Sequence, residues 1–372
     1  IFGKFIMIKK NTMYIVSSSQ KTLLKDILAK KLALLFGNFE VMEINGFDDQ
    51  TARSFIADKI PDTAVPENII SYMIQLSQGS PFYLETILKH FSATMKAKGK
   101  NAAGHKECLL DALAGLLYES DGIFNQYFTN NINFFLEKKT RKKFIPVLVS
   151  LARGNTTISS MRDERGKADR ELGEKLHKLQ KMDLISKSGV FYKIQDRLFE
   201  FWLRNVYDLK ASAMVDDLDI KYLEFKKLID DDFREYCEFR SKTFPDVVCE
   251  LFASFRGQKA LLSMHERKLP FFDSIEKRQV SENVARIAGR AGNKIWSCHI
   301  KQDDLTDEHD INLLSGLKTG DDELKITRRI MIPLKGIEHN AFLLAKEKNI
   351  WVWDVRELNK MLRLFGKYEL VL

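Results

Sequence analysis

The sequence contains few cysteines and prolines, and it has no long apolar run. The four cysteines are Cys108, Cys237, Cys249 and Cys298. No two of them form a C-x-x-C pair, so we expect buried, reduced thiols rather than a metal site or a disulfide framework. No apolar run reaches about 18 residues, which argues against a transmembrane helix, and the first residues lack the apolar core of a signal peptide. These absences predict a cytoplasmic protein with no membrane partner.

Length and charge set limits on the organisation of the chain and on its partners. A length of 372 residues predicts roughly two to four domains. The 59 Lys and Arg residues outnumber the 51 Asp and Glu residues, which gives a net charge of +8. A moderately basic chain is compatible with nucleic-acid binding. The first residue is Ile1 rather than Met, and we expect it to lie inside a longer polypeptide.

A short motif, Gly79-Ser-Pro-Phe-Tyr-Leu84, interrupts a helical segment that extends over Pro66–Phe91. Glycine readily adopts the left-handed conformation that ends a helix, and proline suits the first turn of the next one. We therefore expect two helices joined by a turn, with Gly79 ending the first helix and Pro81 opening the second. This turn is referred to below as the Gly-Ser-Pro turn.

A second pattern begins near residue 141 and combines three short helices with a hairpin. The predicted helices are Arg141–Arg153, Thr156–Met161 and Ala168–Met182, followed by a hairpin at Leu184–Ile194 and an apolar helix at Leu198–Tyr207. The hairpin is expected to turn at Ser188-Gly189, where glycine permits a positive φ. Three helices and a hairpin are typical of a winged helix, which is a variant of the helix-turn-helix.

The N-terminal segment is predicted to alternate strands and helices. Apolar residues Met13–Val16 predict a buried strand that ends in the polar residues Ser17, Ser18 and Ser19. Ligands bind at such strand ends in open α/β sheets. The pattern then predicts a helix over Lys21–Leu35, a strand over Phe39–Ile44, and a helix from Asp48 to Ile60.

The C-terminal segment is predicted to form an α/β domain. A helical stretch over Tyr222–Phe255 is broken at Pro245. The predicted strands are Val284–Ala288, Lys294–Ile300, Arg328–Leu334 and Ile350–Trp353. The predicted helices are Asn340–Glu347 and a final one, capped by Asp354, that extends to Phe365.

Residues 1 to 207, with the two signatures described above, resemble the back half of archaeal-type P-loop ATPases of the AAA+ and STAND superclass. The resemblance implies ATP and Mg²⁺ as cofactors, a sensor role for Ser17, Ser18 and Ser19, and an adenine-facing role for Gly79 and Pro81. The phosphate-binding motif G-x-x-x-x-G-K-[ST] is absent from the sequence. ATP hydrolysis is therefore expected only if a P-loop segment precedes Ile1.

The expected winged helix carries several basic residues that could contact DNA phosphates. They are Arg170, Lys175, Lys178, Lys181, Lys187 and Lys193. Such contacts would make binding depend on salt, and double-stranded DNA is the expected partner. Acidic residues interleave with these cations, and winged helices in such ATPases also bind proteins. A protein partner or a homo-oligomer therefore remains an alternative.

The C-terminal part, about residues 230 to 372, resembles the restriction-endonuclease-like domain attached to many of these ATPases, and Ala345–Asn359 is its best-matching stretch. The resemblance implies a Mg²⁺ site with an acid on one strand and E-x-K on the next. Here Lys301 is present, but His299 replaces the acid, and the first acid would fall near Ala285. Glu250 on the preceding helix could supplement the site. Because imidazole is a poor ligand for Mg²⁺, the domain is expected to be an inactive nuclease.

Four regions follow from these observations. Residues 1–62 are the expected remnant of an α/β ATPase core, 63–136 an all-α lid, 137–210 the winged helix, and 211–372 linker helices with the nuclease-like domain. The predicted function is that of the C-terminal part of a nucleotide-controlled, DNA-binding ATPase. The alternatives are a Mg²⁺-dependent nuclease that uses Lys301 and a non-enzymatic regulator that binds DNA or protein.

Overall fold

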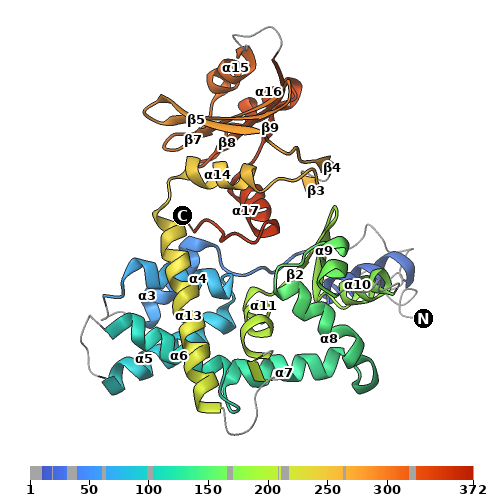
Figure 1. Cartoon of the computed structure of the whole chain (residues 1–372), viewed down its shortest axis with the longest axis vertical. Helices are drawn as coiled ribbons and strands as arrows, with labels where there is room; N and C mark the ends of the chain where they lie inside the picture. Colours follow the sequence, from blue (N-terminus) through green and yellow to red (C-terminus); the bar gives the residue numbers. More distant parts are fainter. Residues whose placement is uncertain are drawn as a thin grey trace. The chain divides into compact units, whose positions relative to one another are not determined.

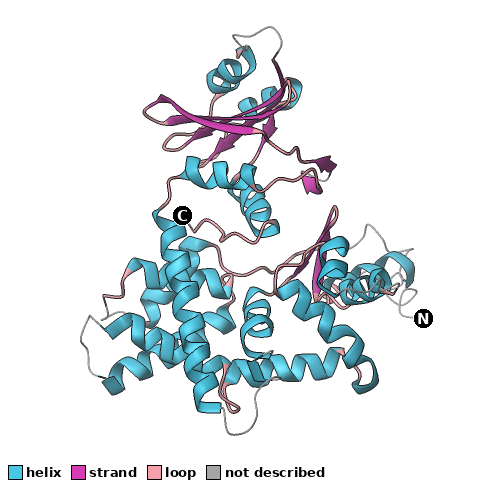
Figure 2. Cartoon of the chain, in the orientation of Figure 1, coloured by secondary structure: helices cyan, strands magenta, loops and turns pink. Residues whose placement is uncertain are grey.

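The computed structural model has a mixed α/β fold (Figures 1 and 2). It describes residues 11–18, 20–31, 40–60, 64–98, 104–165, 171–207, 209–210, 218–262, 265–317 and 324–371. The chain divides into two compact units. The first comprises Ile1–Lys187 and Tyr192–Asp231, and the second comprises Ser188–Phe191 and Asp232–Leu372.

The first part of unit one is helical. Its elements are α2 (Lys21–Asp26), the π-helical turn η1 (Ile27–Lys31), α3 (Asp49–Lys59), α4 (Glu67–Ser77), α5 (Pro81–Lys98), α6 (His105–Leu117) and α7 (Ile123–Phe135). Asp48 caps α3 as predicted, because its carboxylate accepts a hydrogen bond from the Thr51 backbone at 2.8 Å. The predicted helix from Lys21 is confirmed as far as Lys31, and its remaining predicted residues, 32–35, lie outside the described part of the chain.

A helix–hairpin segment follows over residues 138–207, all of it in unit one except the hairpin tip Ser188–Phe191. Its elements are α8 (Lys138–Ala152), α9 (Ile158–Arg165), α10 (Leu172–Lys181), β1 (Ile185–Ser188), β2 (Phe191–Ile194), α11 (Arg197–Trp202) and the π-helical turn η4 (Leu203–Tyr207). Leu172, Leu176 and Leu179 of α10 are completely buried, which confirms the predicted inward face. The hairpin turns at Gly189, which has a positive φ of 60°. The helices and the hairpin predicted here are thus confirmed.

Two predicted strands near the N-terminus are wrong. Residues 12–18 and 40–48 have no regular secondary structure, and Met13 and Ile15 are 87% and 85% exposed. Val41, Met42 and Ile44 are also exposed. A strand requires neighbouring strands to satisfy its backbone and bury its side chains, and no described segment pairs with either stretch. Apolar composition alone therefore did not produce a sheet here. Phe39 lies outside the described residues.

The second unit is built around one mixed five-stranded sheet. Helix α13 (Leu218–Ser241) leads into it. The unit contains α14 (Phe244–Ala253), β3 (Lys259–Leu262), β4 (His265–Lys268), β5 (Ser274–Ser281), β6 (Val284–Ala291), β7 (Lys294–Lys301), α15 (Glu308–Gly316), β8 (Lys325–Pro333), α16 (His339–Glu347), β9 (Trp351–Val352) and α17 (Val355–Leu364). Strands β5, β6 and β7 form an antiparallel meander, and β8 and β9 add in parallel, following α15 and α16 in the chain.

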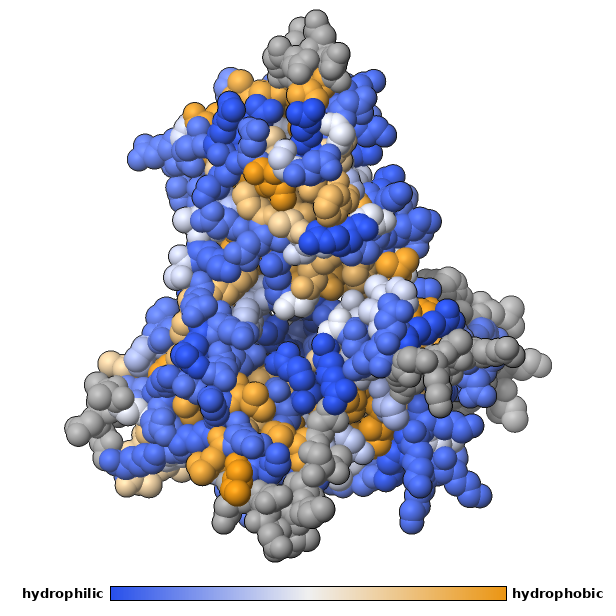
Figure 3. All heavy atoms as spheres, in the orientation of Figure 1, coloured by the Kyte–Doolittle hydropathy of each residue, from blue (hydrophilic) through white to orange (hydrophobic). Residues whose placement is uncertain are grey.

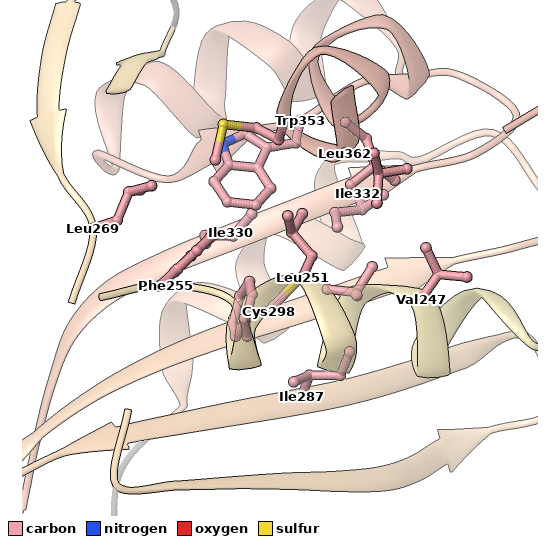
Figure 4. Packing of buried hydrophobic residues seen from close by; sticks show 14 of the residues in the cluster. Val247, Leu251, Phe255, Leu269, Ile287, Cys298, Ile330, Ile332, Trp353 and Leu362 are labelled. Carbon is pink, nitrogen blue, oxygen red and sulfur yellow. The ribbon is translucent and has the colours of Figure 1, made fainter. Parts of the chain in front are cut away.

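Helices cover both faces of this sheet (Figure 1). On one face, Leu251 of α14 and Leu362 of α17 pack against Cys298, Ile330 and other apolar strand residues (Figure 4). On the other face, α15 and α16 contribute a smaller cluster around Met331. Because side chains alternate along a strand, β7 has an apolar face at Cys298 and Ile300 and a polar face at residues 297, 299 and 301. The predicted strands and the final helix capped by Asp354 are confirmed; β3–β5 and α15 were not predicted.

Candidate functional site

The Gly-Ser-Pro turn leaves no room for a side chain at position 79, where the backbone also has a positive φ. Helix α4 ends as Gln78 and Gly79 take successive positive φ values of 50° and 70°, and Pro81 then starts α5. The Phe47 backbone N–H donates to the Gly79 carbonyl at 2.8 Å. A Cβ on Gly79 would lie 2.1 Å from the Phe47 carbonyl oxygen, and one on Gly46 would lie 2.4 Å from the Gln78 carbonyl oxygen. The turn is therefore packed backbone to backbone against residues 46–47.

Two side chains extend from this turn to the start of α11. The Gln78 side-chain oxygen accepts a hydrogen bond from the Arg197 backbone N–H at 3.0 Å. The Tyr83 hydroxyl donates to the Asp196 carboxylate. Asp196 is also the N-cap of α11, where it accepts from the Phe199 backbone at 2.9 Å. The structure thus brings the two sequence signatures, more than 100 positions apart, into direct contact.

An aromatic cluster surrounds this contact. The rings of Tyr83 on α5 and Phe124 on α7 meet edge to face with centroids 5.4 Å apart. The ring of Phe128, also on α7, has its centroid 5.7 Å from that of Trp202 on α11. The Trp202 indole N–H donates to the Asn125 side chain at 3.1 Å, satisfying a buried donor. Helix α7 therefore holds both α5 and α11, and a displacement of Tyr83 would be opposed by tightly packed rings.

Burial and charge keep the Tyr83 hydroxyl protonated in this contact. Burial and the neighbouring Asp196 carboxylate raise the pKa of Tyr83 above its ordinary value. The hydroxyl therefore remains a donor at all physiological pH values. Sequence analysis selected Gly79 and Pro81 but missed Gln78, Tyr83 and Asp196. The available signal was the position of Asp196 at the start of an apolar helix, where an N-cap is expected.

The serine cluster adjoins a second connection to the helix–hairpin segment. Ser17 and Ser18 lie in an exposed irregular segment, and the Ser18 hydroxyl accepts from the Gln20 backbone at 3.0 Å. Thr22, in the first turn of α2, donates from its backbone to Asp183 at 2.9 Å, and its hydroxyl also donates to Asp183. Ser19 lies outside the described residues. The expected sensor role of the three serines remains a prediction.

The basic residues expected to contact DNA differ in exposure. Lys178, Lys181 and Lys187 are exposed. The Lys175 side chain is only 15% exposed and lies 4.0 Å from the Glu171 carboxylate. Lys193 is 7% exposed, so in this conformation it is poorly placed for a phosphate contact. Arg170 lies outside the part of the chain that the structure describes.

Lys301, at the end of β7, has an acidic partner that the sequence analysis did not identify. Its ammonium group lies 2.6 Å from the Asp310 carboxylate, and both side chains are 13% exposed. Hydrogen bonding and charge from Asp310, opposed by partial burial, raise the pKa of Lys301. Asp310 also forms a capping box with Asp307 at the start of α15. The D-x-x-D spacing was the signal that could have revealed this acid.

The position expected to hold a metal-binding acid is electropositive instead. His299 is 6% exposed and pairs across the sheet with Arg286. Burial and the Arg286 charge lower the pKa of His299 to about 4, so its ring is neutral at pH 7. Among the described residues, Arg286 Nε, Ser297 Oγ and His299 Nε2 are buried without a hydrogen-bond partner. A guanidinium beside the imidazole disfavours a divalent cation.

Glu250 pairs with lysines other than Lys301. Its carboxylate instead lies 2.6 Å from the Lys242 ammonium and 3.4 Å from that of Lys367. These two lysines outweigh partial burial and lower the pKa of Glu250. Ala285, at the other expected acid position, is completely buried. Within the described ranges, no group of three or more His, Cys, Asp or Glu residues is arranged to hold a metal ion.

Comparisons with known proteins give only weak structural similarity. No family model matches the sequence, and no curated protein matches it. Among solved structures, a Walker-type ATPase of Pyrococcus abyssi aligns with 20% identity and a TM-score of 0.35. The alignment covers 50% of this chain and 51% of that chain. A similarity of this size carries no argument about fold or function.

The face of the molecule drawn in Figure 3 is largely polar. Hydrophilic residues dominate the face drawn in Figure 3, with smaller hydrophobic patches between them. Exposed apolar side chains of unit one include Ile220 and Leu223 near the start of α13. In the described part of the chain, no helix combines the length and the hydropathy required to cross a membrane.

Proposed function

We propose that this chain is the C-terminal part of a nucleotide-controlled ATPase, in which the Gly-Ser-Pro turn acts on a winged helix that binds DNA. The observation that carries the proposal is the direct connection of the turn to α11, through Gln78 with Arg197 and Tyr83 with Asp196. A nucleotide that shifts the start of α5 would move Tyr83 and, through Asp196, the base of the hairpin. Rearrangement of packed helices by a ligand is a known basis for switching.

The residues of this chain fit one part of a nucleotide site. Pro81 is exposed at the start of α5, where it could pack against adenine, and Gly79 allows close approach of the backbone. The phosphate-binding loop and its lysine are not among these 372 residues. ATP and Mg²⁺ would therefore be held jointly with a P-loop segment, and the described residues alone are not assigned a hydrolytic step.

The first test measures nucleotide binding by the protein from its native source, together with its intact mass. The proposal requires a mass larger than that of these 372 residues by a P-loop half-domain, and saturable ATP binding. A native protein that binds no ATP in a calorimetric titration would refute the proposal. Saturable binding that disappears on removal of the extra segment would support it.

A second test addresses the connection between nucleotide and DNA. In the native-length protein, ATP should change the affinity for a DNA duplex, and Asp196→Asn should reduce that change because the Tyr83 hydrogen bond is weakened. Asp354→Asn is a matched control: Asp354 caps α17 by accepting from the Glu357 backbone at 2.7 Å, but it lies in the other unit. Equal effects of the two variants would show that Asp196 has no specific role.

DNA contact by the proposed winged helix is supported by the exposed residues Lys178, Lys181 and Lys187. We expect duplex binding that weakens steeply with salt, and a loss of affinity in Lys178→Glu/Lys181→Glu. If that double variant binds the duplex as tightly as the unmodified protein, this surface does not contact DNA. Retained binding of a protein partner would then favour the interpretation as an interaction module.

We further propose that the second unit is a nuclease-like domain without nuclease activity. The adjacent strands β6 and β7, with Lys301 at the end of β7, support the resemblance. His299 and Arg286 argue against a bound Mg²⁺. Incubation of supercoiled and linear DNA with Mg²⁺ or Mn²⁺ should give no cleavage. Cleavage that is lost in Lys301→Ala would contradict this proposal and establish the nuclease alternative.

A further inference from the structure

Two arginines of the second unit stack on one tryptophan at the edge of the sheet. The Arg328 guanidinium lies 4.2 Å from the centroid of the Trp351 ring, and that of Arg267 lies 5.6 Å from it. Trp351 is held by Trp296, whose ring meets it edge to face at 5.3 Å. The three residues Arg267, Trp351 and Arg328 are called the Arg–Trp–Arg stack below. They come from β4, β9 and β8, so the fold rather than a local motif assembles them.

The charges of this stack are not balanced within the described residues. Among those residues, neither Arg267 nor Arg328 forms an ion pair or a side-chain hydrogen bond. Burial and the nearby Arg267 charge lower the pKa of Arg328. The effect of Arg267 is the one expected when two cations lie close together. Lys294 lies on the same strand face as Trp296, two positions away, and adds positive charge. An anionic partner would relieve this repulsion.

We propose that the Arg–Trp–Arg stack is a second nucleic-acid contact, which binds the phosphodiester backbone independently of the winged helix. Stacking on an indole holds a guanidinium flat and leaves its N–H edge available for paired hydrogen bonds to phosphate oxygens. Arg267, Arg328 and Trp296 already contact the Trp351 ring, so the stack suits phosphates better than stacked bases. A polyanion also fits two cations held this close, because duplex DNA carries one charge per about 1.7 Å of its axis.

The test measures fluorescence anisotropy of a labelled duplex, and of one of its strands alone, over a series of NaCl concentrations. Arg267→Ala/Arg328→Ala should weaken binding about tenfold and lower the slope of log affinity against log salt by about 2. The matched control is Arg278→Ala/Arg290→Ala, which removes two exposed arginines of the same sheet. The control should retain the full slope. Equal slopes and affinities in the two double variants would overturn the proposal.

Further arms separate this proposal from the proposed function and from a folding defect. Arg267→Lys/Arg328→Lys keeps both charges, so it should keep the salt slope while losing affinity, because lysine lacks the planar fork. If Lys178→Glu/Lys181→Glu abolishes binding while the arginine variants do not affect it, the winged helix contacts DNA and the Arg–Trp–Arg stack does not. The opposite pattern supports the stack and refutes the winged-helix contact. Absence of binding to either DNA refutes both.

Discussion

Replacing Gly79 by alanine tests the packing of the Gly-Ser-Pro turn against residues 46–47. The alanine would have to adopt a φ of +70°, and its Cβ would lie 2.1 Å from the Phe47 carbonyl oxygen. The left-handed conformation costs a non-glycine residue about 1–2 kcal/mol. Relief of the clash requires separation of the two segments and loss of the Phe47–Gly79 hydrogen bond, which contributes about 1 kcal/mol. We expect Gly79→Ala to lower the free energy of unfolding by about 2–3 kcal/mol.

A control glycine in the same unit separates conformational strain from the clash. Gly154 has a φ of +93°, and a Cβ there would meet no atom within 4 Å. Gly154→Ala should therefore lower the free energy of unfolding only by the cost of placing alanine at a positive φ. The measurement is urea unfolding followed by circular dichroism, with the first-unit transition fitted separately. If Gly79→Ala is no more destabilising than Gly154→Ala, residues 46–47 do not pack against the turn and the argument for the site fails.

Three further predictions concern buried polar contacts. Tyr83→Phe leaves the Asp196 carboxylate with one partner fewer and should lower the free energy of unfolding by about 1.5–3 kcal/mol in urea titrations; no measurable change would remove the proposed connection. The depressed pKa of His299 means that the unfolded state binds the proton more readily, so the second unit should lose about 3 kcal/mol as the pH falls from 6.5 to 4. His299→Asn should abolish that loss, whereas His265→Asn, at an exposed position, should retain it. Lys301→Ala leaves the Asp310 carboxylate without its cation and should lower the free energy of unfolding of the second unit in urea titrations at pH 7; no measurable change would refute the role of this ion pair.

Local sequence signals predicted most of the helices and four of the five strands of the large sheet. The caps at Asp48 and Asp354, the Gly-Ser-Pro turn and the hairpin at Gly189 act within a few residues, so their signals are present in short windows. The predictions of strands near Met13 and Val41 were wrong because strand formation depends on partners elsewhere in a sheet. Composition in a short window carries no information about those partners.

The candidate site was predictable only in part, because its main contacts join distant residues. Gly79 and Pro81 could be selected from the turn, but the hydrogen bond from Tyr83 to Asp196 depends on tertiary packing. Lys301 was identified, whereas its partner Asp310 lies on a helix that was not predicted. The assignments of Ser17–Ser19 and of the basic residues of the hairpin segment remain predictions, since side-chain exposure alone does not test a sensor or a phosphate contact.

The hydrogen bonds of Gln78, Tyr83 and Thr22 to residues 183–197 also affect how unit one unfolds. Because α2, α4 and α5 are bonded to the start of the hairpin and of α11, these elements cannot open one at a time without leaving buried polar groups unpaired. Their amide hydrogens should therefore exchange with solvent as one block, with similar protection. The hairpin, despite its short strands, would then be as kinetically stable as the helices around it.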